Sequence, residues 1–266
     1  MGKKSGSKIL KRTMSPNFWQ IERKNKRFVT KPSSGPHPSK LSIPLTVLLR
    51  DILKLTKTYS ETKIIIGANQ VKIDGRVRKD PNYPVGLMDV IEITKTDSLY
   101  RLVPSKKTLI PVSIPDNERN TKLCKVINKT SIDKDTFQYS FHDGRTIKTS
   151  SSTNVSVGST FKIELPSQKL EKIIELKTDS LIILIGGQNK GLIGTVKGIN
   201  ESSFSRPEML DVTANNKTIE VNSDLVMVIG EKTSEINKLA SICRISSPTL
   251  SGRLYGLWEK AFMLNS

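Results

Sequence analysis

Side chains suited to acid–base or nucleophilic chemistry are few in this sequence. His37 and His142 are the only histidines among 266 residues. Asp143 follows His142 directly, but adjacency in the sequence does not by itself create a general base and the carboxylate that orients it. Ser33-Ser34-Gly35 lacks the glycines of a nucleophile elbow. The sequence therefore gives hydrolase chemistry no support.

Metal binding and disulfide chemistry are also poorly supported. Cys124 and Cys243 lie far apart and have neither a CxxC neighbour nor a flanking histidine. We interpret both as reduced, partly buried thiols. His37, which lies between two prolines, is expected to fix the N-terminal segment in place or to contact phosphate. His142 is expected to sit in a hydrogen-bonded turn. We expect no metal, no cofactor and no small-molecule substrate.

The strongest chemical signal is charge. Lys and Arg number 43 against 25 Asp and Glu, which gives a net charge of +18. Half of the excess lies in residues 1–31, which hold ten basic residues and one acid. Such an arm is typical of binding to a polyphosphate, because each neutralised phosphate releases condensed counterions. The alternative is a solubilising or nuclear-import tail.

Aromatic residues interleave this basic arm, and four prolines between residues 16 and 38 exclude a long helix. An extended arm with rings that can stack suits a folded RNA surface better than a regular DNA duplex. The RNA contacts expected from the arm are Lys3, Lys4, Lys8, Lys11, Arg12, Trp19, Arg23, Lys24, Lys26, Arg27, Lys31 and His37.

Two helices are predicted after the arm. Apolar residues at helical spacing predict an amphipathic helix over residues 44–55. Its other side carries Arg50, Lys54 and Lys57, which can face RNA or simply solvent. A second, shorter helix is predicted from Ser60, whose hydroxyl can cap it.

A basic hairpin is predicted next. Residues 71–78 alternate around Asp74-Gly75, which is the strongest short-range signal for a β-hairpin. Residues 83–93 predict a turn followed by a strand. Two short helices, a basic hairpin and a turn with a strand form the order of the alpha-L RNA-binding motif, which this segment resembles. The contacts expected here are Arg50, Lys54, Lys57, Lys72, Arg76, Arg78 and Lys79.

Two further segments are predicted to be rich in β-structure. Residues 99–174 combine many Thr, Val and Ile with turn signals, which predicts several short strands. Residues 181–196 predict a strand, a glycine-rich turn and a second strand, and resemble a KOW motif on an SH3-like barrel. The P-loop pattern GxxxxGK[ST] fails, because Lys190 precedes Gly191 and no Ser or Thr follows. These glycines can equally form a barrel-corner turn without a ligand.

Eight stretches carry a wider resemblance. They are Leu10-Lys11-Arg12 with Trp19, Lys31 to His37, Pro44 to Arg50, Lys72 to Arg78, Tyr83 to Ile91, Lys122 to Val126, His142 to Ile147 and Gly186 to Gly191. In type and order they resemble the ribosomal protein S4e family of eukaryotes and archaea. Two departures stand out: Leu192 replaces an often basic residue, and the sequence after Glu231 lacks the family's usual basic ending.

The resemblance implies a structural and assembly component held against small-subunit rRNA and neighbouring small-subunit proteins. It also implies a cytoplasmic location on ribosomes, with nucleolar assembly in a eukaryote. Arg145 and Lys190, which lie within matching stretches, complete the expected RNA contacts.

The expected fold class is α+β, mostly β. Its predicted divisions are an extended basic arm at 1–40, an alpha-L (S4-type) RNA-binding domain at 41–98, a central β domain at 99–174, an SH3-like KOW barrel at 175–232 and a helical tail at 233–266. The longest purely apolar run has five residues, whereas a membrane helix needs about 20. No secretory signal is expected, because no apolar core follows the Lys-rich start. We therefore expect no membrane partner.

Two other classes of protein share these modules. Pseudouridine synthases also carry alpha-L motifs, but their Asp nucleophile lies in a Gly-Arg-Leu-Asp context, and residues 251–255 read Ser-Gly-Arg-Leu-Tyr. We therefore do not expect an enzyme. KOW domains also occur in transcription elongation factors, so a non-ribosomal RNA-binding or elongation factor is the alternative. Association with polymerase instead of a ribosomal subunit would distinguish it.

Overall fold

The computed structural model describes residues 7, 9–22, 24, 26–133, 136–150, 155–204, 206–214, 217–231 and 233–236. Within those ranges, no helix is long and apolar enough to cross a membrane. Lys3, Lys4, Lys8 and Arg23 of the expected RNA contacts lie outside the described residues. The predicted helical tail also lies outside them, apart from residues 233–236, which form bends.

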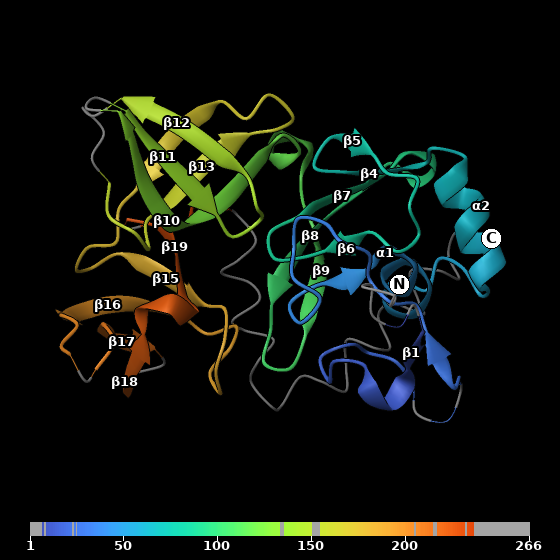
Figure 1. The fold of residues 1–266 in the computed structure, drawn as a ribbon, viewed down its shortest axis with the longest axis horizontal. Coiled ribbons are helices and arrows are strands. Elements are labelled where there is room, and N and C mark those ends of the chain that lie inside the picture. The colour runs from blue at the N-terminus through green and yellow to red at the C-terminus, as the bar shows by residue number, and fades with distance from the viewer. Residues whose placement is uncertain are drawn as a thin grey trace, which may run out of the picture.

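Three five-stranded antiparallel sheets dominate the described chain (Figure 1). Each belongs to one unit, and we name them the first, central and third units in chain order. The first unit is the right half of Figure 1, and the other two lie one above the other on the left. Helices are short and belong almost wholly to the first unit. The expectation of a mainly β fold with few helices is confirmed.

The first unit packs two helical segments against its sheet. In spatial order the sheet strands are β5 (Arg76–Val77), β4 (Val71–Ile73), β7 (Val90–Ile93), β8 (Ser98–Pro104) and β9 (Leu109–Ser113). The helical segments are α1 (Leu45–Val47), its π-helical continuation η2 (Leu48–Ile52) and α2 (Tyr59–Gly67). Shorter elements are β1 (Leu10–Lys11), η1 (Arg12–Met14), β2 (Phe28–Val29), β3 (Ile43–Pro44), β6 (Pro84–Val85) and η3 (Thr94–Thr96). Leu48 and Ile66 from the helices share a buried core with Ile91 from the sheet.

Both predicted helices are present. The first ends at Ile52 instead of near Leu55, so Lys54 and Lys57 lie beyond it. The second begins at Tyr59, near Ser60 as predicted, but has a different cap. Thr58, not Ser60, caps α2: its hydroxyl accepts from the backbone N–H of Glu61 at 3.2 Å. The Glu61 carboxylate accepts in return from the N–H of Thr58, which completes a capping box. Ser60 thus lies inside the first turn instead of before it.

The arm folds onto the first unit where the structure describes it. Trp19 is 3% exposed and belongs to the core of that unit. Its indole Nε1–H donates to the carbonyl of Ser42 at 2.9 Å. A ring buried in this way cannot stack on RNA, so the expected contact at Trp19 is corrected to a packing role.

The central unit is a sheet with a long, protruding hairpin. In spatial order its strands are β12 (Thr146–Ser150), β11 (Thr136–Phe141), β10 (Thr121–Asp133), β13 (Thr160–Glu164) and β14 (Leu170–Ile174), preceded by η4 (Asp116–Glu118). Tyr139, Phe141 and Phe161 form the middle of its core. Residues 98–113, mostly expected in this unit, pair instead with the first sheet.

The third unit follows the predicted order of strand, glycine-rich turn and strand. In spatial order its sheet contains β18 (Lys217–Asn222), β17 (Met209–Ala214), β16 (Ile193–Asn200), β15 (Leu181–Leu184) and β19 (Val226–Gly230), with η5 (Ser223–Leu225) before β19. Its core also contains Met88 and Val103 of the first unit and Leu123 of the central unit. A shared core of this kind holds the three units together.

The glycine-rich turn lies against the protein itself. Gly191 has a φ of +85°, and a Cβ there would come within 2.7 Å of the Cα of Ser105 in the turn between β8 and β9. The neighbouring Lys190 places its Nζ 5.4 Å from the centre of the Phe18 ring. This arrangement supports the reading of Gly191 as a corner-turn residue, because close approach to a neighbouring backbone already requires glycine.

Two alanine substitutions distinguish the destabilisation caused by this steric contact from the destabilisation caused by a positive φ. Gly187 has a φ of +77°, but a Cβ there would meet nothing nearer than 3.7 Å. Gly187→Ala is therefore expected to cost about 1 kcal/mol, and Gly191→Ala about 1–3 kcal/mol more through overpacking. Urea unfolding of the full chain measures both. Equal losses would contradict the contact with Ser105.

Candidate nucleic-acid interface

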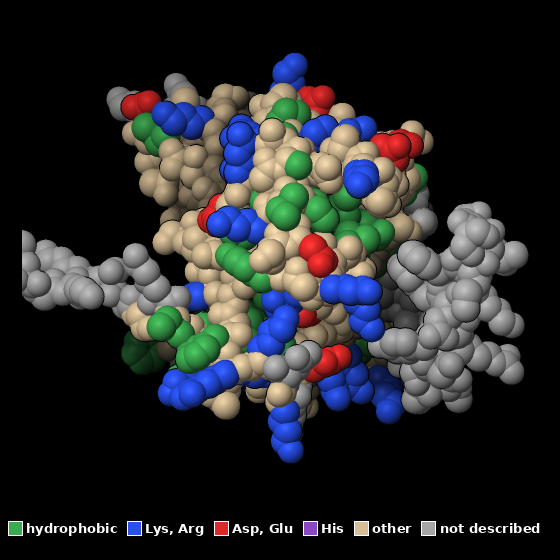
Figure 2. Space-filling view, turned by 90° about the vertical axis from the view of Figure 1, so that its right-hand side faces the viewer, with side chains coloured by type: hydrophobic (Ala, Val, Ile, Leu, Met, Phe, Trp, Pro, Cys, Tyr) green, Lys and Arg blue, Asp and Glu red, His purple; other side chains and the backbone are tan. Residues whose placement is uncertain are grey.

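Most of the expected RNA contacts in the described chain lie on the surface. Figure 2 shows the face at the α2 end of the molecule, where Lys and Arg side chains spread widely with fewer Asp and Glu among them. The exposed members of the expected set are Lys11, Lys24, Lys26, Arg27, Lys31, Lys54, Lys57, Arg76 and Lys79. They come from the arm, from the segment between η2 and α2, and from the hairpin of β4 and β5.

Four expected contacts are partly engaged by the protein. Arg12 donates to the carbonyl of Ile21 at 2.8 Å, and Lys72 pairs with Glu92 at 3.0 Å. Arg78 lies over the ring of Tyr83, with 4.5 Å from its guanidinium carbon to the ring centre. Lys190 lies over Phe18 as described, and burial lowers the pKa of its ammonium. These cations keep only part of their surface for a ligand.

Two further expected contacts, Arg50 and His37, lie inside the protein, as Trp19 does. Arg50 is 9% exposed, and its Nε and Nη2 donate to the carboxylate of Asp51 at 2.9 and 2.7 Å. His37 is 5% exposed, and its Nε2 lies 3.0 Å from both carboxylate oxygens of Asp89. Both expectations of an RNA contact are corrected, because the polar atoms already have carboxylate partners within the protein. For His37 the geometry fits the alternative expectation, that this residue fixes the arm.

The basic hairpin is formed as predicted. Ile73 pairs with Arg76 on either side of the turn, and Asp74 and Gly75 have φ values of +52° and +73°. Positive φ at both central residues is the geometry of a type I′ turn, which favours Asp-Gly. The turn directs Arg76 outward, where its side chain is exposed.

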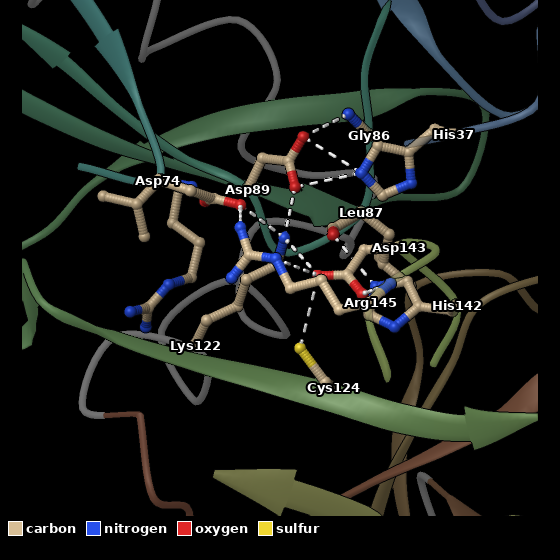
Figure 3. A network of polar contacts seen from close by, with 12 residues as sticks. His37, Asp74, Gly86, Leu87, Asp89, Lys122, Cys124, His142, Asp143 and Arg145 are labelled. Carbon is tan, nitrogen blue, oxygen red and sulfur yellow. Dashed lines mark hydrogen bonds and ion pairs between the residues drawn. The ribbon is translucent and has the colours of Figure 1, made fainter. Parts of the chain in front are cut away.

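Behind the hairpin lies a buried ion cluster, which we define as Asp74, Asp89, Lys122, Asp143 and Arg145 (Figure 3). The Lys122 ammonium is within 2.8 Å of Asp74, 2.6 Å of Asp89 and 3.1 Å of Asp143. Arg145 pairs with Asp74 at 2.6 Å and with Asp143 at 3.3 Å. Asp74 and Asp89 belong to the first unit and the other three to the central unit, so the cluster spans their interface.

Neighbouring groups complete the cluster. His37 adds the arm through Asp89, which also accepts from the N–H of Gly86 at 2.8 Å. A Cβ on Gly86 would lie 2.3 Å from the His37 ring, so only glycine leaves room for the histidine. The Cys124 thiol donates to Asp143 at 3.5 Å and is buried and unpaired to sulfur, as expected of a reduced thiol.

The shifted pKa values of Lys122 and Asp143 favour the charged forms of both groups. Burial alone would lower the pKa of Lys122, but Asp74, Asp89 and Asp143 outweigh it and raise that pKa well above its usual value. Burial would raise the pKa of Asp143, but Lys122, His142 and Arg145 lower it to about 2. A buried charge is tolerated only when it is paired in this way.

His142 lies beside the cluster in a hydrogen-bonded turn, as predicted. Its Nδ1 accepts from the backbone N–H of Lys125 at 3.2 Å, and its Nε2 lies 3.1 Å from the carbonyl of Leu87. Burial and the charge of Lys122 lower the pKa of its imidazole to about 4. The ring is therefore neutral at physiological pH, and it links the central unit to the first.

No pattern of residues pointed directly to the cluster. Lys122 stood out only as part of a family-like stretch, and lysine is rarely buried. Asp74 was visible only as a turn residue. The five members span residues 74–145, and they meet only because two units with separate sheets lie against each other. Their positions inside the family-like stretches were the sole available hint.

Comparison with known proteins agrees with this architecture. Residues 96–170 match the model of the Ribosomal family S4e, and residues 4–40 match the RS4NT (NUC023) domain. The small ribosomal subunit protein eS4 of Methanothermobacter thermautotrophicus is 38% identical over 232 residues, which is 86% of this chain and 95% of the relative. The protein of the same name from Saccharolobus islandicus is 38% identical over 228 residues, 84% of this chain and 95% of the relative.

A solved structure shows the same relationship. The crystal structure of the 30S ribosomal protein S4e from Thermoplasma acidophilum matches with a TM-score of 0.64 at 27% identity, over 73% of this chain and 98% of that one. Fold and sequence thus define a ribosomal protein of the S4e type. The chain belongs to the family of small ribosomal subunit protein eS4.

The lowered pKa of His142 predicts a pH dependence of stability. Its imidazole has a pKa of about 4 when folded against an ordinary value of 6.5. Between these values the unfolded chain takes up a proton that the folded chain does not, so stability present above pH 6.5 is lost as the pH falls toward 4. The limiting slope is about 1.4 kcal/mol per pH unit for one proton.

Denaturant unfolding of the wild type and of His142→Asn at several pH values measures this contribution. The Asn oxygen can still accept from the N–H of Lys125, as the imidazole Nδ1 does. The variant is expected to lack this part of the pH slope above pH 4. Identical slopes in both proteins would contradict the assignment to His142.

Proposed function

We propose that the protein is a structural constituent of the small ribosomal subunit, where it binds and stabilises folded small-subunit rRNA and supports translation. The observation that carries this proposal is the 38% identity to small ribosomal subunit protein eS4 over 95% of that relative's length. A transcription elongation factor that shares only a KOW module would match over one module. The alternative function is therefore not favoured, and no enzymatic role is proposed.

The three units carry distinct parts of this role. We assign the first unit to the alpha-L (S4-type) class, because α1 with η2, α2, the basic hairpin and β7 follow that order. The third unit is assigned to the KOW class on an SH3-like barrel, because β15, a glycine-rich turn and β16 form part of a five-stranded antiparallel sheet. The central unit connects the two and supplies most of the buried ion cluster.

The proposed RNA contacts are the exposed cations of the arm and the first unit. They are Lys11, Lys24, Lys26, Arg27, Lys31, Lys54, Lys57, Arg76 and Lys79; the arm residues Lys3, Lys4, Lys8 and Arg23 stay part of the proposal from the sequence. Such cations neutralise phosphates and read the shape of a folded RNA, so readout of individual bases is minor. Neighbouring small-subunit proteins are the expected protein partners, on cytoplasmic ribosomes and, in a eukaryote, during nucleolar assembly.

The hairpin contact is tested by removing two exposed cations. Arg76→Ala combined with Lys79→Ala should weaken binding to small-subunit rRNA. It should also reduce the slope of log Kd against log salt by about one to two, because up to two phosphate contacts are lost. Filter binding over a range of salt concentrations measures both effects.

A matched control removes the same formal charge elsewhere. Lys177 and Lys197 are exposed in the third unit, but each pairs with an acid of its own, Glu175 at 2.6 Å and Asp179 at 3.2 Å. Lys177→Ala with Lys197→Ala should leave the salt slope nearly unchanged. If both double variants behave alike, the hairpin makes no specific contact and only net charge matters.

A further inference from the structure

We infer that Arg145, expected from its sequence to contact RNA, is a positioning residue that anchors the basic hairpin through Asp74. In this role it fixes the direction in which Arg76 and Lys79 meet RNA. The inference rests on the proposed function, because the RNA contact of the hairpin is part of that proposal. Arg145 then affects RNA binding by holding the hairpin in place and not by contacting a phosphate.

The hairpin needs an anchor because it has little hydrogen bonding of its own. Strand β5 contains only Arg76 and Val77 and lies at the edge of the sheet. Its pairing with β4 consists of two residue pairs, Lys72 with Val77 and Ile73 with Arg76. Strand β4 is fixed by three residue pairs with β7, whereas β5, at the edge of the sheet, pairs with β4. The orientation of β5 and of the turn before it therefore depends on what holds the turn.

Asp74 holds that turn from within. Its Oδ1 accepts from the backbone N–H of Val90 at 3.0 Å, and its Oδ2 accepts from Lys122 at 2.8 Å and from Arg145 at 2.6 Å. Asp74 is 5% exposed, so these are charge-assisted hydrogen bonds out of reach of most solvent screening. The turn of the first unit is thereby tied to two cations of the central unit, as Figure 3 shows.

Arg145 is built into this contact instead of facing a ligand. Its side chain is 18% exposed, with Nη2 on Asp74 and Nε on Asp143. The guanidinium therefore bridges two carboxylates that belong to two different units. A cation neutralised twice inside the protein offers a phosphate much less than the exposed Arg76 does.

The same interface also holds the arm. A Cβ on Gly144, in the turn that precedes Arg145, would lie 3.5 Å from the carbonyl oxygen of Pro36. His37 reaches Asp89 beside Lys122. The cluster thus sets the arm and the hairpin in one fixed relation before RNA arrives. A preorganised surface loses less conformational freedom on binding and so binds more tightly.

A double-mutant cycle on the full chain separates positioning from direct contact. Arg145→Gln is made in the wild type and in the Arg76→Ala, Lys79→Ala background, and binding to small-subunit rRNA is measured for all four proteins. If Arg145 acts through the hairpin, its loss weakens binding roughly tenfold in the wild type and by less than about twofold when the hairpin cations are absent. An equal loss in both backgrounds would assign Arg145 to direct contact with RNA and overturn the inference.

Hydrogen exchange of the RNA-free protein supplies a second readout. Amides of residues 71–79 should exchange faster in Arg145→Gln than in the wild type, because the anchor of the turn is weakened. The isosteric Asp74→Asn should act in the same direction and serves if Arg145→Gln does not fold. Unchanged exchange in a folded variant would overturn the anchoring role.

Lys125→Gln is the matched control. Lys125 is also a cation of the central unit that the protein engages, and it is buried, but it donates to the carbonyls of Ser223 and Asp224 in the third unit, at 2.9 and 2.8 Å. Its loss should leave hairpin exchange unchanged and should have the same effect on binding in both backgrounds. Coupling of the same size between Lys125 and the hairpin would overturn the inference, because general loosening would then explain it.

The two proposals fail in distinguishable ways. If the Arg76→Ala, Lys79→Ala protein binds rRNA as the wild type does, the hairpin contact of the proposed function is overturned. Faster exchange in Arg145→Gln would then still support the anchor, because that readout involves no RNA.

Discussion

The arrangement of this protein depends on one buried ammonium group. Lys122 is 1% exposed and sits among Asp74, Asp89 and Asp143, which reach it from three separate segments of the chain. Losing one partner of such a group leaves an uncompensated buried charge, which costs about 3–5 kcal/mol. The ion pairs of Lys122 therefore favour one relative arrangement of the first and central units.

Apolar packing extends this constraint to the third unit. Leu123, directly after Lys122, lies in the same core as Ile182 of β15 and Val228 of β19. On the other side of Lys122 in space, the His37–Asp89 contact holds the end of the arm. The exposed cations of the arm and hairpin are thus mounted on one continuous body, which suits a protein whose partner is a large folded RNA.

Local patterns predicted much of the fold. The helical segment after residue 44, the Asp74-Gly75 hairpin and the glycine-rich turn were visible because each depends on neighbouring residues or on backbone dihedral angles. The assignment of residues 98–113 to the first sheet was not visible, because the partner of a strand is chosen by tertiary contacts. The same limit applies to the capping of α2, where Thr58 and Ser60 offer nearly the same hydroxyl.

The site was predicted less completely than the fold. Exposed cations such as Lys57 and Arg76 were identified from composition and spacing, which describe surfaces well. His37, Arg50 and Arg145 were expected to contact RNA as well, but carboxylates of the protein engage them. Residue type alone does not distinguish a cation that faces a phosphate from one that faces an aspartate across an interface between sheets.

Membership of the small ribosomal subunit is tested most directly by sedimentation of the tagged protein from its own cells through sucrose gradients at low and high salt, with rRNA and polymerase probed in each fraction. An integral component is expected to migrate near-stoichiometrically with small ribosomal subunits at both salt concentrations. Migration with polymerase, or as free protein at both salt concentrations, would contradict membership of the subunit.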